Sequence, residues 1–133
     1  MTKEQILLTV ISSLLSGLVG VAVSSWFYAR LEKRRMKMET ARKMFGNRHD
    51  ISSPKFQESL NEIMIVFSDS QEIIEAVENS LTIAATSPDA RPKGAADEAL
   101  IKLMKAVCRN IGIKQRLPDA YYLKYFSVPK QNV

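Results

Sequence analysis

A long apolar stretch opens the chain. From Ile6 to Tyr28 the sequence carries no Asp, Glu, Lys or Arg. A helix of this length covers about 34 Å at a rise of about 1.5 Å per residue, and the hydrocarbon core of a bilayer is about 30 Å thick. Trp26 and Tyr28 stand at its end, where amphipathic rings favour the membrane interface. The pattern predicts one transmembrane helix over residues 6–28, after a short segment (residues 1–5).

Two other interpretations of this stretch fit less well. A buried core helix of this length would need a larger surrounding domain than 133 residues provide. A cleaved signal peptide carries positive charge before its apolar part and small residues after it. Here Lys3 and Glu4 cancel in front, and aromatic and basic residues follow.

Helical patterns continue after the span. Residues 29–45 contain no Gly or Pro, and Leu31, Met38 and Phe45 recur every seven residues, which predicts a basic juxtamembrane helix. Ser53 and Pro54 form a helix start, with the serine as N-cap and the proline at the first helical position.

Further apolar residues at helical spacing predict an all-α domain of three to four helices over residues 46–133. Gly112 is expected to end its third helix. Pro118 is expected to open a short last helix, and Ser127-Val128-Pro129 to follow as an extended end. The predicted apolar faces are Phe56, Leu60, Ile63, Met64 and Phe67; Ile73, Ile74, Val77 and Leu81; and Leu100, Ile101, Met104, Val107, Cys108 and Ile111.

The net charge of +5 is confined to one segment. Seven basic and two acidic residues between Arg30 and Lys43 account for all of it. Basic residues directly after a span favour the cytoplasmic side, so we expect the N-terminus outside and the helical domain in the cytoplasm. The single cysteine excludes an intrachain disulfide and fits a reducing compartment. The cations expected to contact lipid headgroups are Arg30, Lys33, Arg34, Arg35 and Lys37.

One face of the predicted span is small and weakly polar. Such residues let helices approach closely and hydrogen-bond across the contact, so the face predicts self-association. Alternatively, the hydroxyls are only tolerated because they bond to their own helix, or they border a narrow water-filled pore. The residues of this assembly face are Thr9, Ser12, Ser13, Ser16, Gly17, Gly20 and Ser24.

The known enzyme motifs do not fit this chain. It has no phosphate-binding glycine loop, nucleophile elbow or HExxH motif, and its one histidine and one cysteine are far apart. We therefore expect no catalysis, no metal site and no cofactor. Glu58 and Glu62 are four residues apart, a pattern typical of a solvated helix face.

An anion site is one specific hypothesis. A helix N-terminus attracts anions through its unpaired N–H groups, and basic residues surround the helix start at Ser53. The candidate phosphate contacts are Arg42, Arg48, His49 and Lys55, with Lys43 as a further neighbour. The alternative is that Arg48 pairs with Asp50. Tyr121, Tyr122, Tyr125 and Phe126 are most simply packing residues, and their other role would be stacking on a bound base.

The stretch MFGNRHDISSPKFQESL and its continuation resemble small bacterial single-span membrane proteins of unknown function. The matching residues are Arg48, Ser53, Pro54, Leu60, Asn61, Ile63 and Phe67, and YYLKYFSVP resembles the C-terminal end of those proteins. The chain also resembles, more weakly, the membrane effector of the Hailong anti-phage system. That resemblance implies a homo-oligomeric, tetrameric, channel-like protein of the bacterial inner membrane, held closed by an oligonucleotide that a partner nucleotidyltransferase makes.

Two functions are therefore expected. In the first, a homo-oligomeric effector forms a pore or disrupts the lipid bilayer, and an anionic oligonucleotide gates it. In the second, the span is only a tether, and the helical domain docks a partner protein. The small-residue face favours the first, because a tether has no need of it.

Overall fold

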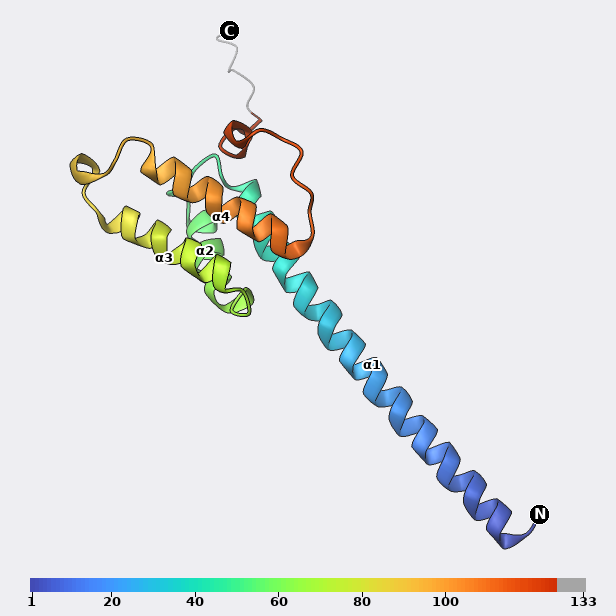
Figure 1. Cartoon of the computed structure of the whole chain (residues 1–133). Coiled ribbons are helices and arrows are strands. Elements are labelled where there is room, and N and C mark those ends of the chain that lie inside the picture. The colour runs from blue at the N-terminus through green and yellow to red at the C-terminus, as the bar shows by residue number, and fades with distance from the viewer. Residues whose placement is uncertain (127–133) are drawn as a thin grey trace. The chain divides into compact units, whose positions relative to one another are not determined.

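The computed structural model describes residues 1–126, and every regular element in that range is helical. The predicted all-α fold class is confirmed. Four α-helices and two short 3₁₀ turns follow one another along the chain (Figure 1). The chain forms two compact units, one ending at Arg35 and one beginning at Met36.

Helix α1 (Lys3–Gly46) contributes to both units. It contains a segment long and apolar enough to cross a membrane, and none of that segment is buried. Among residues 1–126 there is thus one candidate span, near the N-terminus, as the sequence predicts. The limits of 6 and 28 for the span stay a prediction.

The last turns of α1 belong to the helical domain. Thr40, Ala41 and Met44 are buried, and Met38 and Phe45 pack against the core. The sequence analysis began the domain at residue 46, whereas the second compact unit already includes α1 from Met36 onward. The physical reason is hydrophobic burial, because these mostly apolar side chains recur at helical spacing and are covered by other helices of the domain.

Helix α2 (Pro54–Val66) begins as predicted. Ser53 is its N-cap, and the Ser53 hydroxyl accepts a hydrogen bond from the Phe56 N–H at 3.3 Å, with proline at the first helical position. Phe56, Ile63 and Phe67 are buried. Met64 was expected on the same face but is exposed, because the buried stripe is narrower than the predicted one.

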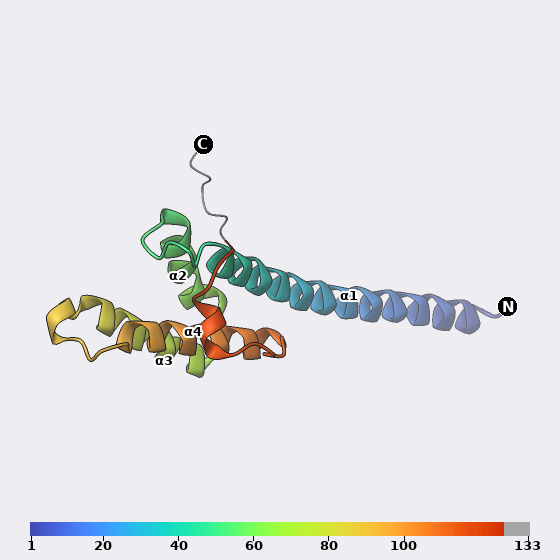
Figure 2. The same ribbon diagram turned by 90° about the horizontal axis from the view of Figure 1, so that it is seen from above.

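Helices α3 (Gln71–Ala85) and α4 (Ala95–Ile111) run side by side in opposite directions (Figures 1 and 2). Ser70 caps α3, and an ion pair between Glu72 and Arg109 joins the two helices. The connection contains the turn η1 (Pro88–Ala90), and Arg91 donates from it to the carbonyls of Ala84 and Thr86.

Left-handed glycines flank α4. Gly94 has a φ of 76° and Gly112 a φ of 80°, a conformation that L side chains rarely adopt. The Gly112 N–H donates to the Arg109 carbonyl and the Ile113 N–H to the Cys108 carbonyl, which ends the helix as predicted.

The last regular element of the described residues is the turn η2 (Asp119–Tyr122), which follows Pro118. The predicted short helix is therefore only a 3₁₀ turn. Lys105 of α4 holds Asp119 at 2.9 Å, and Tyr122 is buried against the core. The expected extended end at Ser127-Val128-Pro129 lies outside the described residues.

Candidate functional site

The turn before α2 was the predicted anion site, and the chain's own side chains already fill part of it. Asp50 Oδ1 accepts hydrogen bonds from the Ser52 hydroxyl at 2.6 Å and the Ser52 N–H at 3.1 Å. These bonds hold the pKa of Asp50 below its ordinary value. An ionised carboxylate therefore lies at this turn, and it opposes a second anion there.

Arg48 has a structural partner on each side. Its Nη1 donates to the Phe45 carbonyl at 2.7 Å and its Nε to the Lys124 carbonyl at 2.9 Å. The guanidinium thus ties the end of α1 to the segment after η2. Its recorded partners are these carbonyls rather than Asp50, so they replace the ion pair considered from sequence.

The other three candidate contacts are exposed. Arg42 borders an apolar cleft beside Phe45. His49 packs its ring on Tyr125, with centroids 5.8 Å apart. The structure therefore brings Arg48 and His49 to the C-terminal segment, and Lys55 shares no recorded contact with them among residues 1–126.

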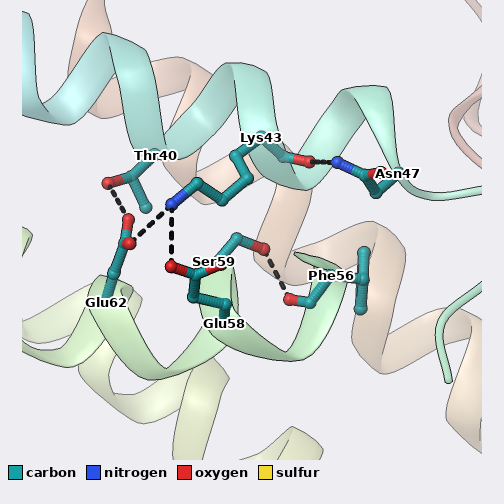
Figure 3. A network of polar contacts seen from close by, with 7 residues as sticks. All are labelled: Thr40, Lys43, Asn47, Phe56, Glu58, Ser59 and Glu62. Atoms are coloured by element: carbon teal, nitrogen blue, oxygen red, sulfur yellow. Dashed lines mark hydrogen bonds and ion pairs between the residues drawn. The ribbon is translucent and has the colours of Figure 1, made fainter. Parts of the chain in front are cut away.

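A polar network between α1 and α2 was missed by the sequence analysis (Figure 3). Lys43 Nζ lies 2.6 Å from Glu62 Oε1 and 3.6 Å from Glu58 Oε1. The Thr40 hydroxyl donates to Glu62 Oε2 at 3.0 Å. The Lys43 hydrogen bond lowers the pKa of Glu62, and the same bond raises the pKa of Lys43.

This network changes the interpretation of two sequence features. The Glu58 and Glu62 pair faces a cation of α1, whereas the sequence analysis treated it as a solvated surface pair. Lys43, a further neighbour in the predicted anion site, is engaged by these two acids. The only sequence signal was the four-residue spacing of the two acids, which does not name the partner helix.

The predicted basic cluster divides. Arg30, Lys33, Arg34 and Arg35 are exposed, and the Arg30 guanidinium lies 5.4 Å from the centre of the Trp26 ring. Lys37 differs from these four, because its ammonium group contacts Asp69 at 3.1 Å and Asn110 at 2.9 Å. The reason is that Lys37 already lies in the second compact unit, over the Phe67 ring.

The predicted assembly face is open along its length. All seven of its residues are exposed, and a Cβ added at Gly17 or Gly20 would meet no atom within 4 Å. The Thr9 hydroxyl donates to the Gln5 carbonyl of its own helix at 2.8 Å, which is the bond expected if the hydroxyl is only tolerated in the span.

Two open clefts lie in the helical domain, and sequence reasoning did not find them. The first encloses about 280 Å³ and the second about 260 Å³. Phe45, Cys108 and Ile113 line both. The first is completed by Arg48, Lys114, Gln115, Arg116, Leu117, Tyr121 and Tyr122, and the second by Met38, Ala41, Arg42 and Ile111.

Burial shifts the pKa of two side chains that line these clefts, Cys108 in both and Tyr122 in the first. It raises the pKa of the Cys108 thiol and that of Tyr122, so both are neutral near pH 7. The clefts therefore combine mostly apolar walls and two neutral polar groups with the cations Arg48, Lys114 and Arg116 on the first cleft and Arg42 on the second. Within residues 1–126, no three His, Cys, Asp or Glu side chains gather where they could hold a metal ion.

Comparison with known proteins gives a family and nothing more detailed. No curated protein and no solved structure matches the chain. The model of a family described as a family of unknown function (DUF6680) matches residues 1–122, which include every helix and turn described above. The chain belongs to this family of unknown function, DUF6680.

Proposed function

We propose that the protein is a homo-oligomeric, single-span membrane effector of bacterial anti-phage defence. Its spans assemble into a pore or a membrane-disrupting bundle. An anionic oligonucleotide at the cytoplasmic helical domain controls this assembly. The proposal joins the exposed span, its small-residue face and the resemblance to the Hailong effector.

The exposed apolar segment of α1 carries the proposal. None of that segment is buried within the chain, and it meets the length and composition of a membrane span. Exposed apolar surface costs about 25 cal/mol per Å² in water, so a segment of this length needs lipid or other helices around it. The exposed cations that follow, from Arg30 to Arg35, suit anionic headgroups.

The assembly step is supported by the open glycines. Because a Cβ built on Gly17 or Gly20 would meet no atom within 4 Å, the space beside both glycines is open, and the backbone of a second span can approach closely there. Hydroxyls beside the glycines can donate across such a contact, or face water in a central pore.

The ligand step rests on three exposed basic side chains of the helical domain. Arg42, His49 and Lys55 are exposed and can meet phosphate, but Arg48 is held by carbonyls and Asp50 opposes an anion at the turn. A ligand that regulates must also bind the open and closed states with different affinity.

A second function is a membrane-tethered adaptor whose domain docks a partner protein. The observation in its favour is an apolar surface on α2, where Met64 is 44% and Ile65 is 77% exposed. Exposed apolar residues that adjoin one another are common at protein interfaces.

A direct test expresses the full chain in bacteria and records the membrane potential. In parallel, oligomers are trapped with a chemical cross-linker that does not react with cysteine. The unchanged chain should depolarise the membrane and form cross-linked oligomers. A Gly17→Leu, Gly20→Leu double variant should do neither, because two bulky side chains separate the helices. A Leu14→Ile, Leu18→Ile variant, on the opposite side of the span, should behave like the unchanged chain.

Each outcome bears on a different step. A membrane that stays polarised under all activating conditions excludes the pore, while cross-linking unaffected by the glycine substitutions excludes this assembly face. For the ligand, Arg42→Ala and Lys55→Ala should weaken binding of a short synthetic oligonucleotide, and Lys93→Gln should not. Unchanged dissociation constants would remove the oligonucleotide from the proposal and favour the adaptor.

A further inference from the structure

We propose that two clefts of the helical domain, which share three lining residues, bind an acyl-chain carboxylate, the chemistry of a fatty acid. The chain would lie across Phe45, Cys108 and Ile113, which line both clefts. The carboxylate would lie at the cationic rim of the first cleft. The clefts share Arg48 and Arg42 with the candidate phosphate contacts, but the proposal does not rest on the oligonucleotide.

Charge complementarity points to an anionic head group. Arg48, Lys114 and Arg116 border the first cleft, and no Asp or Glu is among its lining residues in the described chain. Two carbonyls fix the Arg48 guanidinium and use two of its five N–H donors, which leaves donors for a carboxylate. Three cations beside a cleft that no carboxylate lines therefore favour an anion there.

The walls point to an apolar body behind that head group. Ile113, Leu117 and Tyr121 are exposed on the first cleft, and Met38, Ala41 and Ile111 line the second. Among the second cleft's lining residues Arg42 alone is polar or charged, apart from the neutral thiol of Cys108. Sugar hydroxyls would find few partners on such walls, whereas an acyl chain needs none.

The size of the clefts favours an elongated occupant. Pockets for small molecules usually enclose about 300 to 1,000 Å³, and each cleft alone falls just below that range. Because three residues line both, one flexible chain can occupy both and remove their exposed apolar surface from water.

The test places a thiol in the cleft of the full chain. In a Cys108→Ala, Ile113→Cys variant, the only thiol replaces a side chain that is 47% exposed. The protein is held in phosphatidylcholine nanodiscs, and the rate of alkylation by N-ethylmaleimide is followed by mass spectrometry. Laurate should slow alkylation several-fold. Dodecanol, which has the same chain length and enters the bilayer but carries no charge, should not.

Matched variants then test the rim. Lys114→Gln with Arg116→Gln should abolish the protection by laurate, while Lys93→Gln, an exposed cation outside the clefts, should keep it. Equal protection by dodecanol, or protection that survives the double substitution, overturns the proposal. Protection by a short oligonucleotide but not by laurate would overturn it as well and assign the cleft to the other ligand.

A second measurement uses the unaltered chain and so does not depend on the folding of any variant. A diazirine-bearing fatty acid is photo-cross-linked in the same nanodiscs, and the adducts are mapped by peptide sequencing. Adducts at residues 108–122, competed by laurate, support the site. Adducts confined to residues 6–28 show partition into the bilayer only and overturn it.

Discussion

Lys43 Nζ and Glu62 Oε1 lie 2.6 Å apart and connect the last turns of α1 to α2. Thr40 donates to the other carboxylate oxygen, so the acid is held from two sides by one helix (Figure 3). This contact fixes how α2 packs against the part of α1 that belongs to the helical domain.

The ion pair should show coupling in a double-mutant cycle. Glu62→Gln and Lys43→Gln should each lower the midpoint of thermal unfolding by a few degrees, because the first leaves Lys43 with only the longer contact to Glu58 and the second leaves Glu62 without its cation. The double variant should lose less than the sum of the two. Additive losses would contradict the coupling. Lys55→Gln, an exposed lysine at the start of the same helix, is the control and should change little.

The same pair predicts how stability depends on pH. The folded pKa of Glu62 lies below its ordinary 4.5, so its contribution is present above pH 4.5 and is lost as the pH falls through the lowered pKa. The folded pKa of Lys43 lies above 10.5, so its contribution is complete below pH 10.5 and is lost as the pH rises through the raised pKa.

The acid branch can be measured by comparison with Glu62→Gln. The difference in unfolding midpoint between the two proteins should be constant between about pH 6 and 8 and shrink below the ordinary pKa of the carboxyl group. A difference that grows on acidification would contradict the assigned direction.

Truncation of two isoleucines of α2 should change the free energy of unfolding by very different amounts. Ile63 is fully buried, so Ile63→Ala should lower the free energy of unfolding by about 2 to 5 kcal/mol. Ile65 is 77% exposed, so Ile65→Ala should change it by no more than about 0.5 kcal/mol. Denaturant unfolding of the full chain in detergent compares them, and similar losses would contradict the packing of α2.

Arg48 should prove to be a structural residue. Arg48→Ala removes the donors to the Phe45 and Lys124 carbonyls, so amide hydrogen exchange should accelerate over residues 118–126. Arg48→Lys should rescue little, since one ammonium cannot reproduce the guanidinium's two directed bonds. Exchange unchanged in both variants would show that Arg48 does not hold this segment.

The charge that follows the candidate span should set its orientation. In the unchanged chain, a reporter fused to the C-terminus should be cytoplasmic. Replacing Arg30, Lys33, Arg34 and Arg35 with Gln should yield a mixed orientation, because this cluster supplies the positive-inside signal. Replacing Lys93, Lys102, Lys114 and Arg116 with Gln instead keeps the change in net charge equal and should leave the orientation intact.

Local signals were sufficient for the helix ends. Ser53 with Pro54, and Gly112, act through the backbone immediately beside them, so their roles could be predicted from neighbouring residues alone. The buried faces of α2 and α4 followed from periodicity, although Leu103 of α4 is fully buried and was not among the predicted apolar residues.

Long-range partners could not be predicted. The contact of Lys37 with Asp69 and Asn110, and that of Phe45 with Tyr122, join residues distant in sequence. Which helix faces another depends on the packing of the whole domain, and a single sequence does not specify it. For the same reason four cations around Ser53 were predicted as one cluster, while the hydrogen bonds of Arg48 lead to Phe45 and Lys124 and not to the start of α2.

The two left-handed glycines at the ends of α4 have a consequence for how this family can vary in length. A residue inserted within α4 would rotate the buried face of the following turns away from α3. It would also place a residue other than glycine at one of the two positions that need a positive φ. Insertions and deletions are therefore expected between residues 86 and 93, in the polar connection, while α4 itself keeps a constant number of residues.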